Sequence, residues 1–77
     1  EDQVLKNLLW EEFESALTDL PEEQRNIFVR TELRGESYNS ISSETGVPVN
    51  TLISRKHYAV LRLRTRLESI RQEIINS

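Results

Sequence analysis

The chain contains no cysteine and no methionine, and it has a single histidine, His57. The lack of cysteine excludes a disulfide framework and a thiolate zinc site, and one histidine excludes zinc ligation by paired histidines. No apolar run approaches the roughly 18–20 residues that span a bilayer, and the start lacks the basic and apolar regions of a signal peptide. The sequence therefore predicts a cytoplasmic domain that folds on apolar burial alone, without membrane insertion.

Catalytic patterns are also missing. The chain has no glycine-rich phosphate loop, no cluster of metal-ligand residues and no nucleophile with a neighbouring base. Its 77 residues leave room for one small domain, not for a catalytic cleft and a second domain. We therefore expect a single domain over residues 1–77, with no catalytic residue, small-molecule substrate, cofactor or metal. Because the sequence begins at Glu1 and contains no methionine, we expect it to be a segment of a longer protein.

The charge is divided unevenly along the chain, although the formal net charge is only −3. Residues 1–33 hold nine acids against three bases, whereas residues 34–77 hold seven bases against four acids. Such a domain can turn its basic half toward phosphates while the acidic half faces solvent or a basic partner surface. The distribution thus permits nucleic-acid binding where the net charge alone argues against it.

Apolar spacing and helix-end signals predict an all-α fold of four helices. The first covers residues 2–18, where apolar residues recur at three- and four-residue spacing (Leu5, Leu9, Phe13, Ala16 and Leu17). Pro21 is expected at the first position of the second helix, which ends before Gly35. Ser37 is a candidate N-cap for the third helix. The fourth is expected to begin at Pro48 and to run to the end as a long recognition helix.

Residues 38–55 have the pattern of a helix, a tight turn and a second helix, the unit that places its second helix in the DNA major groove. Ser42 permits a close helix crossing, Gly46 can adopt the left-handed conformation that ends the first helix, and Leu52 inserts into the core. Ile41 and Val47 complete the apolar contact. The spacing therefore predicts a helix-turn-helix.

Two faces separate on a helical wheel of the fourth helix, with Asn50 at zero and about 100° per residue. A core-facing stripe lies between roughly 180° and 280°; it comprises Leu52, Ala59, Val60, Leu63, Leu67, Ile70 and Ile74. Polar residues occupy roughly 0° to 140°, and they are Asn50, Thr51, Ser54, Arg55, Tyr58 and Arg62. Lys56 falls within the apolar stripe, so its ammonium is expected to extend toward an acid of the first or second helix.

Several motifs occur in a specific order: Leu-Pro-Glu-Glu-Gln-Arg at 20–25, Gly35 with Ser37-Tyr38, Gly-Val-Pro-Val at 46–49, Thr51, and Ser54-Arg55. Together, over about residues 12 to 67, they resemble region four of bacterial sigma-70-family factors, most closely the extracytoplasmic-function branch. The resemblance implies recognition of double-stranded promoter DNA at the upstream element centred near minus thirty-five. It also implies docking on the RNA polymerase core and allows an anti-sigma factor as a further partner.

The expected DNA-binding residues follow from the helix-turn-helix geometry. It brings Asn50, Thr51, Ser54 and Arg55 to base edges, where arginine suits guanine and asparagine suits adenine. Tyr58 and Arg62, further along the helix, are expected at sugar and phosphate. Three residues before the turn complete the set, namely Arg34, Ser37 and Tyr38.

Departures from the family pattern keep other functions open. Relatives commonly carry glycine at position 50 and basic residues at positions 53, 58 and 60, where this chain has Asn50, Ile53, Tyr58 and Val60. Fewer cations neutralise fewer phosphates, so the isolated domain should bind DNA weakly. One alternative is a helix-turn-helix scaffold used as a protein-interaction module. Another is a response-regulator DNA-binding output domain, which the motif at 20–25 disfavours. The terminal apolar stripe either packs on the first helix or docks another protein.

Overall fold

The computed structural model describes residues 2–76, and side chains for residues 3–73. The four helices are α1 (Asp2–Asp19), α2 (Glu22–Phe28), α3 (Tyr38–Thr45) and α4 (Val49–Asn76). A π-helical turn, η1 (Val29–Leu33), continues α2, and no strand occurs within residues 2–76. The prediction of a small all-α, four-helix domain is confirmed. None of the helices in the described part of the chain has the length and apolar character of a membrane span.

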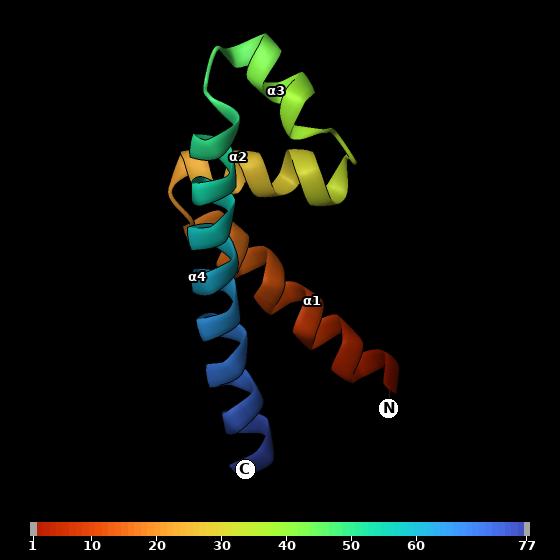
Figure 1. The fold of residues 1–77 in the computed structure, drawn as a ribbon. Helices are drawn as coiled ribbons and strands as arrows, with labels where there is room; N and C mark the ends of the chain where they lie inside the picture. Colours follow the sequence, from red (N-terminus) through yellow and green to blue (C-terminus); the bar gives the residue numbers. More distant parts are fainter. Residues whose placement is uncertain (1, 77) are drawn as a thin grey trace.

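The molecule is elongated along α4, with principal extents of 47 × 20 × 15 Å. Figure 1 shows α2 crossing α4 near its first half, with α3 beyond α2 at the end where α4 begins. Helix α1 meets α4 near the middle and diverges from it toward the N-terminus, so the two helices form a V (Figure 1). This arrangement leaves the start of α4 at the opposite end of the molecule from the two termini.

Two apolar clusters hold the helices together. The first joins α1 to α4 and consists of the buried residues Ala16, Leu20, Ala59 and Leu63. The second joins α2, α3 and α4 through Ile27, Ile41 and Leu52, with Tyr38 and Val47 packed against it. The predicted contact of Ile41 and Val47 with Leu52 is therefore confirmed, and it fixes the angle between the two helices of the helix-turn-helix.

The prolines lie one residue before the positions predicted for them. Pro21 has extended backbone angles, with ψ 144°, and α2 begins at Glu22. Helix α4 likewise begins at Val49, after Pro48. The carbonyl of Pro21 accepts the amide of Arg25 at 2.9 Å, and that of Pro48 accepts the amide of Leu52 at 3.1 Å. Both prolines therefore precede their helices, and the carbonyl of each accepts an amide of the first helical turn.

The apolar stripe predicted for α1 is only partly covered. Ala16 is buried and Phe13 partly so, but Leu5 and Leu9 are exposed. The helix predicted from this spacing is present, but Leu5 and Leu9 belong to neither apolar cluster because α1 diverges from α4 over its first half. On α4, Leu67 and Ile70 of the terminal stripe are half-buried, and the side chain of Ile74 lies outside the described residues.

A matched pair of leucines on α4 tests this packing. Leu63 is 4% exposed within the first cluster, whereas Leu61 is 41% exposed. We expect Leu63→Ala to lower the free energy of unfolding by about 2–5 kcal/mol, because it leaves a cavity. That loss is comparable to the whole stability of such a domain, roughly 3–5 kcal/mol. Leu61→Ala should change it by less than about 0.5 kcal/mol. Urea denaturation followed by circular dichroism measures both, and equal losses would contradict the packing of α4.

Candidate nucleic-acid interface

The turn between α3 and α4 is closed by local hydrogen bonds. Gly46 adopts the left-handed conformation, with φ 78°, and its amide donates to the carbonyl of Ser42 at 2.8 Å. At the other end of α3, the hydroxyl of Ser37 accepts the amide of Ser40 at 3.0 Å. The predicted N-cap and glycine turn are both confirmed. A short, doubly capped α3 therefore leads directly into α4, as major-groove insertion of the second helix requires.

Arg30 ties α3 to the end of the second helix. From η1, its guanidinium donates to Glu36 (Nη2 to Oε1, 2.7 Å) in the loop and to Glu44 (Nη1 to Oε2, 2.7 Å) near the end of α3. The Arg30 side chain is only 15% exposed. Its hydrogen bonds hold the pKa of both carboxyl groups below the ordinary value and raise the pKa of the guanidinium. We call these three residues the Arg30 clasp, and it fixes α3 against η1.

The first turns of α4 present polar groups to solvent. Asn50, Thr51 and Ser54 are exposed, and Arg55 is half-buried at the edge. Tyr58 and Arg62 are exposed further along the helix. The whole stretch from Val49 to Leu67 contains no acidic residue. A phosphate backbone approaching this part of α4 therefore meets no carboxylate of the helix itself.

Two further residues, Ile53 and His57, share this exposed face. They were not among the residues predicted from the sequence to bind DNA. Both are exposed in the structure. On the wheel they lie at roughly 300° and 340°, just before the zero set at Asn50. The wheel already contained that signal, but the predicted face was limited to one side of Asn50. The face observed is wider and includes one exposed aliphatic residue in its first turns.

The cations of α4 differ in their partners. The ammonium of Lys56 pairs with Glu32 of η1 and lies 5.7 Å from the ring centroid of Tyr38, so the predicted salt bridge to the second helical segment is confirmed. The hydrogen bond to Glu32 raises the pKa of Lys56. Arg55 makes a longer contact, with Nε 3.6 Å from Oε2 of Glu23. Lys56 is therefore engaged inside the domain, while Arg55 lies at the margin of the exposed face.

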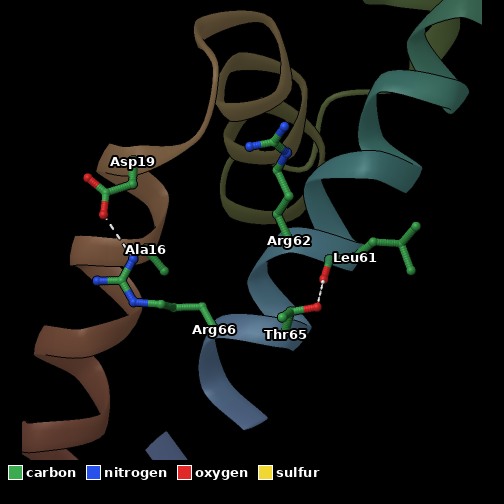
Figure 2. Close-up of a pocket in the computed structure, with 6 residues that line it drawn as sticks. All are labelled: Ala16, Asp19, Leu61, Arg62, Thr65 and Arg66. Atoms are coloured by element: carbon green, nitrogen blue, oxygen red, sulfur yellow. Dashed lines mark hydrogen bonds and ion pairs between the residues drawn. The ribbon is translucent and has the colours of Figure 1, made fainter. Parts of the chain in front are cut away.

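Farther along α4, Arg66 links this helix to α1. It donates to Glu12 at 3.0 Å and to Asp19 at 2.8 Å, and Figure 2 shows the contact with Asp19. Arg62 and Arg66 both line a pocket between α1 and α4 (Figure 2), but Arg62 forms no ion pair with any side chain that the structure describes. Its charge is thus available to an outside anion. Arg64 also has no ion-pair partner among residues 3–73.

The three predicted residues ahead of α4 lie where η1 meets α3. Arg34 is exposed and has no ion-pair partner among the described side chains. Ser37 caps α3, and Tyr38 is half-buried against the second cluster. Both therefore have structural roles, whether or not they also contact a ligand. The contact of Tyr38 with Lys56 brings this segment beside α4.

A separate apolar groove lies between α1 and the second half of α4. Its lining residues are Lys6, Leu9, Trp10, Phe13, Leu67 and Arg71. In Figure 1 these segments lie on the side of the termini, away from α3 and the start of α4. The groove and the exposed face of α4 are therefore two distinct surfaces.

A short helix, a left-handed glycine turn and a long helix with an exposed, acid-free first half define a helix-turn-helix DNA-binding domain. Residues 10–63 match the family described as "Sigma-70, region 4", and the chain belongs to that family. A comparison with curated proteins gives no match. The family implies, in general terms, recognition of the minus-thirty-five promoter element and docking on RNA polymerase. It is a family of DNA-binding domains rather than enzymes.

The Arg30 clasp predicts a dependence of stability on pH. The carboxyl pKa values of Glu36 and Glu44 are lowered in the folded state from an ordinary 4.5. Their contribution is therefore present above that value and is lost as the pH falls through the folded-state values. We expect the melting temperature to fall between about pH 6 and about pH 3, and to fall less when Glu36 and Glu44 are both glutamine. Differential scanning calorimetry measures this.

Glu11→Gln provides the control, because it removes an acid outside the clasp. This variant should keep the pH dependence of the unsubstituted chain. If instead the double variant and the unsubstituted chain lose melting temperature equally on acidification, the clasp does not stabilise the fold.

Proposed function

We propose that this domain binds the upstream promoter element through the first turns of α4, as part of an extracytoplasmic-function-type sigma factor. Asn50, Thr51 and Ser54 supply hydrogen-bonding groups for base edges, and Arg55 suits a guanine or a phosphate. The proposal depends chiefly on one observation: the first half of α4 has one exposed, mainly polar face, and this half of the helix contains no acid.

Phosphate contacts come from Arg55 at the edge of the first turns and from cations outside them. A phosphate contact by Arg62 is supported by the absence of an ion pair between Arg62 and any described side chain. Tyr58 lies one turn earlier on α4 and adds an exposed hydroxyl group. Arg34 is supported in the same way, at the junction of η1 and α3. Arg55 must release Glu23, a contact that costs little because exposed ion pairs contribute roughly 0–1 kcal/mol. These groups set the position of the domain on the duplex, and the residues near Asn50 select the sequence.

The assignment to the extracytoplasmic-function branch is supported by the Leu-Pro-Glu-Glu-Gln-Arg motif at the α1–α2 turn and Gly-Val-Pro-Val at the α3–α4 turn. Both motifs occupy helix ends in the structure. The family supports docking on RNA polymerase, and a cytoplasmic location is proposed on the same ground. A domain held by polymerase near the promoter gains effective concentration, so three unpaired or weakly paired cations suffice for binding.

The first test is the salt dependence of DNA binding. If Arg34, Arg55 and Arg62 each neutralise one phosphate, the slope of log affinity against log salt should be about −2.7, so that raising salt from about 50 to about 200 mM weakens binding about 40-fold. Fluorescence anisotropy with a labelled promoter duplex measures this, and a scrambled duplex is the control. The protein-interaction alternative wins if no binding is detectable at low salt and the polymerase-tethered domain also leaves the upstream element unprotected.

The second test compares two neighbouring cations. Arg55→Ala should weaken promoter binding, by about 1–3 kcal/mol where Arg55 contacts a guanine, and should lower the salt slope where it contacts a phosphate. It should leave stability nearly unchanged, because the pairing with Glu23 is long and exposed. Lys56→Leu should preserve affinity, since Lys56 is already paired with Glu32, and stability should stay equal or rise. Binding and denaturation are measured for both variants. A loss of affinity in Lys56→Leu as large as in Arg55→Ala would mean that a different face of α4 meets DNA.

A further inference from the structure

Ile53 is an apolar side chain at the start of an otherwise polar face. It is 45% exposed and belongs to neither apolar cluster, so the fold does not depend on it. Asn50 and His57, one turn away on the same side of α4, are also exposed. No acidic residue lies within this part of the helix. An aliphatic group is thus offered to whatever covers the first turns of α4.

Base chemistry limits what such a group can recognise in the major groove. Guanine, adenine and cytosine present only hydrogen-bonding groups there, whereas thymine adds the C5 methyl group. Ile53 has no donor or acceptor, so covering a polar edge with it would leave that edge without a partner. Covering the thymine methyl removes two apolar surfaces from water. Because a β-branched side chain in a helix has one strongly preferred χ1 rotamer, little side-chain freedom is lost on contact.

The position of Ile53 also fits neighbouring base pairs. Asn50 and Ile53 are separated by about 4.5 Å along the helix axis. Successive bases of one strand are separated by about 3.4 Å. Two side chains at this spacing reach the same base pair or adjacent ones, so a polar contact from Asn50 and an apolar contact from Ile53 are compatible.

We infer that Ile53 is a specificity-determining residue that contacts the C5 methyl group of a thymine in the upstream promoter element, beside the base contacted by Asn50. The inference rests on the proposed function, because it requires the first turns of α4 to enter the major groove. Ile53 would thus add an apolar contact to the hydrogen bonds that Asn50, Thr51 and Ser54 make with base edges.

Replacing thymine by uracil tests this contact directly, because uracil keeps the hydrogen-bonding edge and lacks only the methyl group. Each thymine of the upstream element is replaced in turn, and affinity for the 77-residue chain is measured at low salt. At one position the unsubstituted chain should bind about fourfold more weakly to uracil than to thymine, the effect of one buried methyl group. Ile53→Ala should bind both duplexes equally at that position. Ile53→Val, which keeps a branched side chain, should retain part of the preference.

Leu61→Ala is the matched control. Leu61 is an aliphatic residue of similar exposure on α4, about 12 Å further along the helix axis, and its removal should leave the uracil effect unchanged. If uracil has no effect at any position, or if Ile53→Ala keeps the full effect, the inference is overturned while the proposed function stands. If the thymine duplex itself does not bind, the proposed function falls and the role of Ile53 falls with it.

Discussion

The burial of Leu52 against Ile27 and Ile41 is the contact on which the candidate site depends. Leu52 is 3% exposed and lies between Thr51 and Ile53 in the first turns of α4. Full burial of each such side chain contributes roughly 1.5–3 kcal/mol, a large share of the stability of a domain of this size. Because helix positions are fixed at about 100° per residue, turning Leu52 inward turns Asn50 and Ser54 outward. A single apolar contact thus both closes the core and orients the exposed face.

Ion pairs divide the cations of the chain into two groups. Arg30, Lys56 and Arg66 each join two elements of the fold, namely η1 to α3, α4 to η1, and α4 to α1. Arg34 and Arg62 have no ion-pair partner among the described side chains. Four acids of the first half pair with bases of α4, namely Glu12, Asp19, Glu23 and Glu32. The stretch of α4 from Val49 to Leu67 has no acid of its own, so a net negative chain can still present a helix face without carboxylates.

Helix caps, turn residues and apolar spacing allowed much of the fold to be predicted from the sequence. The angles between the helices could not be predicted in this way. The cap at Ser37, the turn at Gly46 and the core position of Leu52 follow from short-range chemistry and spacing. The exposure of Leu5 and Leu9 depends on how far α1 diverges from α4, which no periodicity encodes. The Arg30 clasp joins a π-helical turn, a loop and a helix end, and these have no shared repeat. Ile53 and His57 could have been included from the sequence, because the helical wheel places them next to Asn50, but the predicted face was limited to the other side of that residue. The assignment of individual residues to DNA contacts stays a prediction.

A small number of free cations has a consequence for selectivity in the proposed function. Phosphate contacts strengthen binding to any sequence, whereas base contacts strengthen it only at the correct one. The fewer the phosphate contacts, the larger the fraction of the binding free energy that must come from groups such as Asn50 and Ile53. The ratio of specific to nonspecific affinity, rather than affinity alone, decides occupancy among many competing genomic sites. Because attachment to polymerase supplies effective concentration, a weakly basic face costs such a domain little and keeps its sequence preference high.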